Sequence, residues 1–315
     1  MGQQNVTVLR EFVLLGITSL PELQGPIFGV FLIIYIVTVV GNLGMIILTK
    51  VDSHLHTPMY FFIRHLAFID LGNSTVICPK MLVNFLMGQN TISYYACTTQ
   101  MAFFIMFIVS ELYMLLAMAY DRYVAICNPL LYNVTMSQRL CHVLVGITYL
   151  CGTFQSLTIS IKMCTSTFCG SNIINHFYCD DTALLPFLCS NRIELELLII
   201  LFSAFNLFSS LLVVLVSYML ILKAVFRMHS PEGRNKAFST CGSHLTVVVV
   251  FYGTLLFMYV QPMSAHSFDT DKITAVIYDL IIPMFNPLIY SLRNKEVKNA
   301  FLRVFRNPCK CCIQY

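Results

Sequence analysis

The sequence predicts an all-α membrane protein: a seven-transmembrane helix bundle followed by a short amphipathic eighth helix. Hydrophobic residues make up 57% of the 315 residues, and the mean hydropathy is +0.76. Only 11% of the residues are charged, against roughly 25% in soluble domains, so the chain has too few charges to cover a surface that faces water. Apolar stretches of membrane-spanning length also recur along the chain.

These apolar stretches are the predicted transmembrane helices, because each is long enough to cross a hydrocarbon core of about 30 Å. They are residues 27–49, 58–80, 98–122, 140–161, 195–225, 238–260 and 273–291. Residues 1–25 lack the basic start, short apolar run and cleavage site of a signal peptide, so the first stretch is expected to act as a retained signal-anchor. The fifth stretch is longer than a bilayer requires, which predicts a helix that extends past the membrane.

The positions of Lys and Arg predict the orientation of the chain in the membrane, since an odd number of spans places the termini on opposite sides. One side would hold Lys50, Arg122, Arg139, Lys223, Arg227, Arg234, Lys236, Arg293, Lys295, Lys298, Arg303, Arg306 and Lys310. The other would hold only Arg10, Lys80, Lys162, Arg192 and Lys272. Cytoplasmic loops carry the excess of basic residues, so the first side is predicted to be cytoplasmic and the N-terminus extracellular.

The chain is predicted to form one domain with two short flanking parts. Residues 1–26 are the extracellular N-terminus, 27–291 the helix bundle, and 292–315 a cytoplasmic helix and tail. Asn5 begins a glycosylation sequon on the outer side and is the credible acceptor.

The tail is predicted to begin with an amphipathic helix that lies on the membrane. Within residues 294–305 one helical face collects the apolar side chains Val297, Ala300, Phe301, Val304 and Phe305. The cysteines that follow are either palmitoylated or free thiols: Cys309, Cys311 and Cys312.

One helical stripe in the third stretch carries charge into the membrane. Spacings of three and four connect its members, Phe104, Ile108, Glu111, Leu115, Met118 and Arg122. Glu111 and Arg122 are about 16 Å apart along an α-helix and point into the same bundle interior. Charge inside a membrane is costly and by default functional, although an arginine that snorkels to the headgroups is the structural alternative for Arg122.

Polar residues of four stretches are expected to meet at mid-membrane depth: Asn42, Asp70, Glu111 and Asn286. Two carboxylates close together in a low dielectric cannot both be ionised unless a cation or a proton intervenes. The group is therefore predicted either as an ion or proton site built from Asp70, Glu111 and Asn42, or as a neutral hydrogen-bonded cluster that holds the helices together.

The outer half of the bundle is the predicted place for a ligand. Ligands of helix bundles bind between helices in mostly apolar pockets with a few polar groups. The third, fifth, sixth and seventh stretches offer such a lining: Phe104, Ile105, Ile108, Phe202, Ser203, Asn206, Tyr252, Leu255, Leu256, Tyr259 and Asp279. Ordinary helix packing is the alternative for each apolar member.

Five motifs occur in order at the expected spans: LHTPMYFF (55–62), PKML (79–82), MAYDRYVAIC (118–127), KAFSTCGSH (236–244) and PMFNPLIYSLRNK (283–295). Together they resemble the odorant receptors, a family of rhodopsin-like (class A) G-protein-coupled receptors. The resemblance implies a receptor rather than an enzyme. Such a receptor binds small volatile organic ligands and activates a stimulatory olfactory heterotrimeric G protein, which acts through the cAMP pathway. It also implies the plasma membrane of olfactory cilia, and no cofactor other than a sodium ion at Asp70 and Glu111.

The resemblance also assigns roles to single residues. It implies that Arg122, within Asp121-Arg122-Tyr123, is held by the neighbouring acid at rest and engages the G protein when active. Segment 286–290 matches the NPxxY switch, although a proline-bent helix without a switching role is the alternative. The implied switch residues are Tyr123, Tyr218, Asn286, Pro287 and Tyr290, with Tyr252 at the switch position of the sixth span.

Asp279 departs from the family pattern, in which this position is often an uncharged residue. A buried acid there would pair with an amine, accept a hydrogen bond from an alcohol, or stay protonated and bond to neighbouring helices. We therefore predict that Asp279 contributes to ligand selectivity.

Four cysteines are expected on the oxidising outer side: Cys97, Cys169, Cys179 and Cys189. The residues alone leave three possible connectivities. The resemblance implies the pairs Cys97–Cys179 and Cys169–Cys189, which would restrain a lid over the pocket.

Two other functional classes fit the sequence poorly. A small-molecule transporter would have a repeated half and helices broken at mid-membrane, which the unequal spans do not show. For an intramembrane enzyme, no HExxH metal motif occurs in the sequence, and the polar residues match a switch network better than a nucleophile–base pair.

Overall fold

The structure is a computed structural model that describes residues 10–18, 20–88, 90–227, 230–260, 268–293 and 295–306. Four residues with predicted modifications lie outside these ranges: Asn5, Cys309, Cys311 and Cys312. The side chains of three predicted pocket residues also lie outside the description: Leu255, Leu256 and Tyr259.

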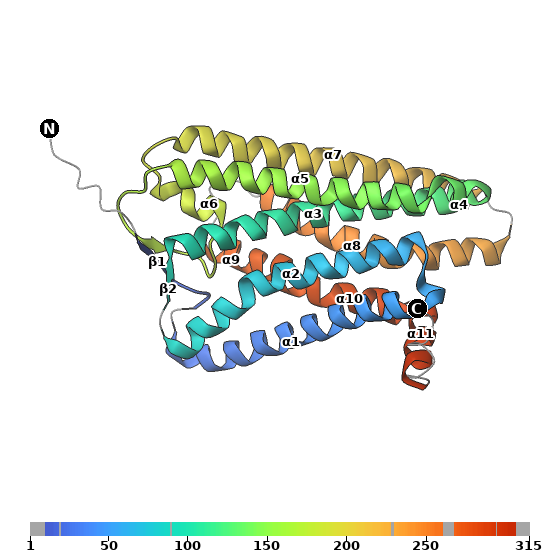
Figure 1. The fold of residues 1–315 in the computed structure, drawn as a ribbon, viewed down its shortest axis with the longest axis horizontal. Helices are drawn as coiled ribbons and strands as arrows, with labels where there is room; N and C mark the ends of the chain where they lie inside the picture. The colour runs from blue at the N-terminus through green and yellow to red at the C-terminus, as the bar shows by residue number, and fades with distance from the viewer. Residues whose placement is uncertain are drawn as a thin grey trace.

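Long helices run alongside one another in a bundle (Figure 1). They are α1 (Pro21–Val51), α2 (Pro58–Met87), α3 (Tyr94–Cys127), α5 (Gln138–Thr165), α7 (Arg192–Phe226), α8 (Pro231–Val260), and a last stretch made of α9 (Phe268–Val276), η4 (Ile277–Ile281) and α10 (Ile282–Arg293). Within the described residues, 6 helices are long and apolar enough to cross a membrane, and α8 adds the shorter apolar helix His244–Thr254. Each predicted apolar stretch falls inside one of these helices, so the predicted seven-helix bundle is confirmed.

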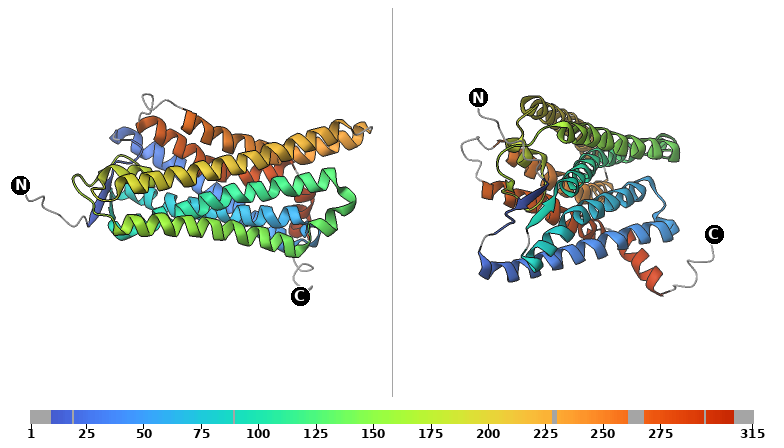
Figure 2. Two further views of the ribbon diagram at one scale, coloured as in Figure 1. Left: turned by 90° about the horizontal axis from the view of Figure 1, so that it is seen from above. Right: turned by 60° about the vertical axis from the view of Figure 1, so that its left-hand side comes forward.

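Short elements close the two ends of the bundle (Figures 1 and 2). One end, called the sheet end here, carries β1 (Glu11–Leu14), β2 (Thr91–Ser93), β3 (Ile173–Ile174), α6 (Asp181–Leu184) and η3 (Leu185–Phe187). The opposite α11 end carries η1 (Ser53–Leu55), η2 (Pro129–Leu131), α4 (Tyr132–Thr135) and α11 (Lys295–Arg306). The helix α11 runs across the bundle axis with Val297 and Ala300 buried and Phe301 52% exposed, which confirms the predicted amphipathic helix.

The three-stranded sheet was not predicted from the sequence. β1 is its central strand, antiparallel to β2 with Phe12 opposite Ile92, and parallel to β3 with Leu14 opposite Ile174. Phe12 and Leu14 are fully buried while Glu11 is exposed, the alternation of a strand with one covered face. β1 has four residues and pairs with segments far along the chain. No local sequence pattern therefore predicts it.

α3 lies at the centre of the bundle. In the most apolar 18-residue part of α3, 67% of the residues are buried, compared with 22% in the corresponding part of α1. The exposed α1 side chains Ile33 and Val40 form a face suited to lipid. α3 and α5 approach closely at Gly152. A Cβ atom there would lie 2.5 Å from Ser110 Oγ and 2.6 Å from the carbonyl oxygen of Met106, so only glycine fits.

Two prolines four residues apart shape the last membrane stretch. Pro283 has no N–H to donate to the carbonyl of Asp279, and its ring would collide with that carbonyl in a regular α-helix. The chain widens into the π-helical segment η4, which ends two residues before Pro283, and this relieves the conflict. Pro287 likewise cannot donate to the carbonyl of Pro283, and Asn42 Nδ2 does so instead at 3.0 Å. The proline spacing therefore creates the acceptor that fixes α1 against α10.

Candidate functional site

A disulfide-tied loop covers the sheet end of the bundle. Cys97, at the start of α3, is joined to Cys179, and Cys169 is joined to Cys189 within the loop; the Cα atoms are 5.4 Å and 5.9 Å apart. Of the three connectivities open to the sequence, this is the one that the resemblance implied. Gln100 adds a polar link, since its Oε1 accepts the backbone N–H of Cys179 at 3.0 Å.

Beneath the loop, residues from α3 and η4 come together. Phe104 is 8% exposed and packs against Tyr178 of the loop, with ring centroids 5.0 Å apart. Asp279 is 1% exposed and lies beside both Tyr178 and Asn73 of α2. Phe104, Tyr178 and Asp279 thus share one region with the predicted pocket residue Ile105, which is buried in the same apolar cluster.

Asn206, a predicted pocket residue on α7, forms hydrogen bonds with neighbouring helices. Asn206 forms a reciprocal amide pair with Gln155 of α5: its Nδ2 donates to Gln155 Oε1 at 2.7 Å and its Oδ1 accepts from Gln155 Nε2 at 3.0 Å. The Tyr113 hydroxyl donates to the same Oδ1 at 2.9 Å. This amide therefore joins α3, α5 and α7, and a contact with ligand stays a prediction.

Other predicted pocket residues range from half-buried to buried. Phe202 packs edge-on against Phe154 of α5 at 6.4 Å between ring centroids, and Phe154 is 65% exposed on the outer surface of the bundle. Ile108 and Ser203 are partly buried, and Tyr252 is buried in the core between the two ends.

Asn42, Asp70 and Asn286 meet inside the bundle. Asn286 Nδ2 donates to Asp70 Oδ2 at 2.9 Å. A cavity of about 10 Å³ lies between these three residues and Tyr290, roughly the room that one water molecule requires. Asp70 Oδ1 and Asn42 Oδ1 are buried and lack a hydrogen-bond partner among the described residues. A water molecule would donate to either oxygen, and a proton would satisfy the Asp70 carboxylate.

Glu111 is fully buried near this cluster, within electrostatic reach of Asp70 and Asp279. It does not line the small cavity. In the described part of the chain, no group of three or more His, Cys, Asp and Glu side chains is arranged to hold a metal ion. The ion or proton role of Asp70, Glu111 and Asn42 stays a prediction.

At the α11 end, Arg122 is paired with its neighbour Asp121. Arg122 is 7% exposed and Asp121 is fully buried. The Arg122 Nε donates to Asp121 Oδ2 at 3.0 Å, and its Nη2 contacts the same oxygen. The Tyr132 hydroxyl donates to the other oxygen at 2.8 Å. Both oxygens of Asp121 are therefore bonded, and Arg122 is held against its own helix while Tyr123 is partly buried beside it.

The remaining predicted switch residues also lie in the core. The Tyr218 hydroxyl and His244 Nδ1 are 2.5 Å apart, which links α7 to α8. The hydroxyl of Tyr290 is buried without a partner among the described residues. Pro287 touches α1 so closely that a Cβ atom at Gly41 would lie 2.9 Å from its Cγ.

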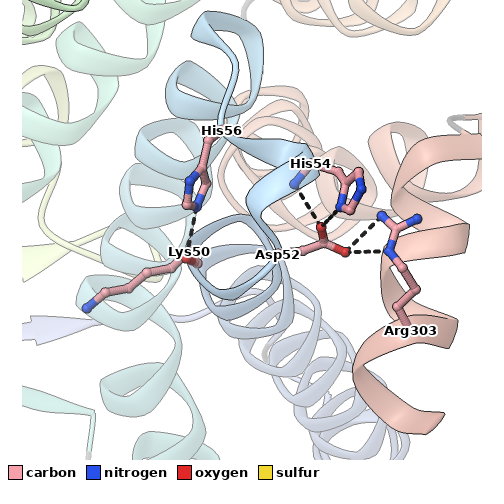
Figure 3. A network of polar contacts seen from close by, with 5 residues as sticks. All are labelled: Lys50, Asp52, His54, His56 and Arg303. Carbon is pink, nitrogen blue, oxygen red and sulfur yellow. Dashed lines mark hydrogen bonds and ion pairs between the residues drawn. The ribbon is translucent and has the colours of Figure 1, made fainter. Parts of the chain in front are cut away.

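Asp52 fixes α11 to the turn between α1 and α2 (Figure 3). Its Oδ2 accepts from Arg303 Nε at 2.9 Å and pairs with Nη2 at 2.8 Å, while its Oδ1 accepts the backbone N–H of His54 at 2.9 Å. Burial by itself would raise the pKa of the Asp52 carboxyl, but the bonds from His54 and Arg303 outweigh it and hold the pKa below its ordinary value. A second link joins the Tyr60 hydroxyl to Glu296 Oε2 at 2.8 Å.

Sequence reasoning missed several residues that shape these sites. Tyr178 and His244 had a usable signal, because one precedes the loop cysteine Cys179 and the other ends the KAFSTCGSH motif. Tyr132 and Asp52 had none, because Asp52 follows the end of α1 and Tyr132 begins the four-residue helix α4, where helical spacing is too short to predict neighbours.

Comparison with known proteins places the chain in a family. Residues 31–308 match the family model described as olfactory receptor. The chain is 74% identical over 307 residues to human olfactory receptor 8K5, with 98% of this chain and 100% of that protein covered. It is 64% identical to human olfactory receptor 8K3, with 98% and 99% covered, and 54% identical to mouse olfactory receptor 8U3, with 95% and 94% covered.

The fold is similar to that of squid rhodopsin, with a TM-score of 0.71, 18% sequence identity, and coverage of 95% of this chain and 89% of that one. At this identity the likeness concerns the fold. Together with the family match, it shows that the chain belongs to the olfactory receptor family of rhodopsin-like G-protein-coupled receptors, which are multi-pass membrane receptors and not enzymes.

Proposed function

We propose that this receptor binds small volatile organic ligands between the helices at its sheet end and activates a stimulatory G protein of the olfactory type, which raises cAMP. The distribution of Lys and Arg supports an orientation with the sheet end outside the cell and the α11 end in the cytoplasm. Residues 1–26 are then extracellular and residues 292–315 cytoplasmic, in the plasma membrane of olfactory cilia.

The observation that carries this proposal is that α3 connects the two ends. Phe104 packs under Tyr178 of the disulfide-tied loop, and Arg122 is paired with Asp121 at the other end of the same helix. A ligand that displaces Phe104 or its neighbours acts on the helix that carries Arg122. The candidate ligand contacts and the candidate output residue therefore belong to one rigid element.

Activation is a shift of population between two arrangements of the bundle. In the arrangement described here, Asp121 and Tyr132 hold Arg122. An odorant that binds more tightly to an arrangement with Arg122 released increases the fraction of receptors in which the G protein can engage it. Tyr218, Asn286, Pro287 and Tyr290 change neighbours in that transition.

Mid-membrane acids adjust the resting state. Asp70 and Glu111 are buried near one another, so their joint charge depends on a sodium ion or a proton. Basal cAMP measured while choline replaces sodium at constant ionic strength detects an ion dependence, and measurement across pH detects a proton dependence. A neutral structural cluster would respond to neither, and Asp70→Asn removes either response.

Asp279 sets part of the ligand selectivity because it is a buried acid in the region of Phe104 and Tyr178. The Asp279→Asn variant keeps the size of the side chain and removes its charge and proton. The ranking of active compounds across an odorant panel is expected to change, with donors of hydrogen bonds losing most. An unchanged ranking would refute this role.

Cyclic AMP in cells that express the chain tests the proposal directly. A panel of volatile compounds should include some that raise cAMP, and Arg122→Ala should abolish that response without loss of surface expression. Arg139→Ala is the matched control, because Arg139 is an exposed arginine at the same end of the bundle. A normal response from the Arg122 variant would contradict the role given to Arg122.

A further inference from the structure

The strand β1 lies between two loop segments at the sheet end (Figure 1). We call residues 10–16 the strap. On one side, the backbone N–H groups of Val13, Leu15 and Gly16 donate to the carbonyl oxygens of residues 172, 174 and 176 of the disulfide-tied loop, at 2.8, 2.9 and 3.2 Å. On the other side, the N–H of Leu14 donates to the carbonyl of Asn90 at 2.7 Å. The strap therefore joins the disulfide-tied loop to the segment that leads into α3.

Two side chains anchor the strap in the core. Phe12 and Leu14 are both 0% exposed. The Phe12 ring packs edge-on against Phe168 of the loop, with ring centroids 5.6 Å apart, and its centroid lies 6.3 Å from that of Tyr94, the first residue of α3. Burial of apolar side chains is a main source of stability, so Phe12 holds the strap, the loop and the start of α3 together.

The loop segment that the strap holds leads directly to Tyr178. Gly16 bonds to the carbonyl of His176, whose ring packs edge-on against the Tyr178 ring at 4.5 Å between centroids. Tyr178 in turn packs against Phe104 and lies beside Asp279. The strap is therefore connected to the predicted ligand site, although none of its residues belongs to the predicted pocket.

Two restraints act on this segment from different directions. The Cys97–Cys179 disulfide joins its end to α3. A single covalent link fixes one point and leaves the rest of a segment free to move about it, whereas the strap adds backbone bonds at residues 172, 174 and 176. The position of the Tyr178 ring therefore depends on the strap as well as on the disulfide.

We propose that Phe12 is a positioning residue for the ligand site: through the strap it holds Tyr178 against Phe104 and keeps the loop closed over a bound odorant. This rests on the proposed binding of odorants at the sheet end. Loss of the Phe12 ring lowers the free energy that local opening of the loop requires. A bound odorant then leaves faster, because opening of a lid limits its release.

Hydrogen exchange of the full-length receptor in lipid nanodiscs tests the strap without a ligand. Phe12→Ala should speed exchange of the backbone amides of residues 172–178 about tenfold, the order expected when the burial of one aromatic side chain is lost. Leu15→Ala is the matched control, because Leu15 is 45% exposed in the same segment, and it should leave exchange unchanged. Equal exchange in the wild type and Phe12→Ala would overturn the proposal.

An active odorant from the cAMP panel tests the effect on the ligand. Its dissociation rate should rise about tenfold in Phe12→Ala, while the maximal cAMP response per receptor at the cell surface stays the same. Phe12→Leu keeps a buried apolar side chain and should restore most of the slow dissociation. Faster exchange of the loop without faster dissociation of the odorant would contradict the positioning role.

A measurement on the unmodified receptor keeps the test decisive if the Phe12 variants do not fold. A ligand that binds under the closed loop stabilises the closed arrangement, so a saturating odorant should slow hydrogen exchange of the strap amides of residues 13–16. Unchanged exchange of these amides with odorant bound would overturn the proposal. Absence of any binding odorant would instead refute the proposed function, and exchange in the ligand-free receptor would still decide whether the strap holds the loop.

Discussion

At the scale of single residues, polar side chains of this receptor form hydrogen bonds with backbone groups that have no backbone partner. Asn42 donates to the carbonyl that Pro287 cannot reach, and Asp52 accepts the N–H of His54 at the start of a short turn. Such groups are costly to leave unpaired when they are buried. Their substitution should therefore reduce stability even where no ligand or G protein is involved.

Asn42→Ala should destabilise the receptor, because the carbonyl of Pro283 would lose its donor inside the bundle. The expected loss in the free energy of unfolding is about 1–3 kcal/mol, the desolvation cost of an unpaired buried group. Thr38→Val is the matched control on the same helix, since the substitution removes a hydroxyl that donates to a carbonyl of its own helix, that of Ile34 at 2.8 Å. Thermal melts followed by circular dichroism in nanodiscs compare the two, and equal melting temperatures would contradict the assignment.

Asp52→Asn should lower stability at neutral pH but not in acid. The pKa of Asp52 is lowered from its ordinary value of 3.8 in the folded receptor, so its charge stabilises the fold above that value. This contribution is lost as the pH falls through the lowered pKa. The difference in melting temperature between the wild type and Asp52→Asn should therefore be constant above about pH 5 and shrink progressively as the pH falls below 3.8.

Arg303 is the residue that forms an ion pair with Asp52. Arg303→Gln should cause a similar loss at neutral pH, and the double variant should lose no more than either single variant. Additive losses would show that the Asp52–Arg303 pair does not hold α11 in place.

At the scale of elements, the bundle depends on close approaches between helices as well as on apolar faces. α3 and α5 meet at Gly152, where a side chain would collide with Ser110 and the backbone of Met106. Small residues of this kind let helix backbones pack closely in membranes. The position of α3 at the centre therefore rests partly on a residue that has no side chain.

Gly152→Ala should destabilise the receptor and reduce its amount at the cell surface. The added Cβ would force α3 and α5 apart, and overpacking of this kind costs about 1–3 kcal/mol. Gly146→Ala on the same helix is the control, because nothing lies within 4 Å of a Cβ atom there and alanine favours the helix by up to about 1 kcal/mol. Surface immunostaining and thermal melts should separate the two variants, and equal behaviour would refute the close approach.

The sequence predicted the helices better than the side-chain contacts between them. Long apolar stretches identify each membrane helix. In the stripe from Phe104 to Arg122, Ile108 is partly buried and the other predicted members are buried. Spacing along one helix does not determine which side chain of another helix it meets, so the pairing of Asn206 with Gln155 and of Tyr218 with His244 was not predicted. The sheet was missed because β1 is short and its partners are distant along the chain.

At the scale of the whole molecule, the receptor has a restrained lid at one end and a restrained arginine at the other. The lid is joined to α3 by the Cys97–Cys179 disulfide and by the bond from Cys179 to Gln100. Arg122 is held by Asp121 and, through it, by Tyr132. Both restraints act on α3, so a change in the lid contacts is expected to alter the restraint on Arg122.

The central claim is that ligand binding at the sheet end and G-protein binding at the α11 end are coupled. Such coupling is reciprocal, so the dissociation constant of an active odorant should be measured in nanodiscs with and without nucleotide-free G protein. We predict that the G protein tightens odorant binding by about 5- to 150-fold and that Arg122→Ala removes this shift. An odorant dissociation constant that is the same with and without G protein would contradict the account.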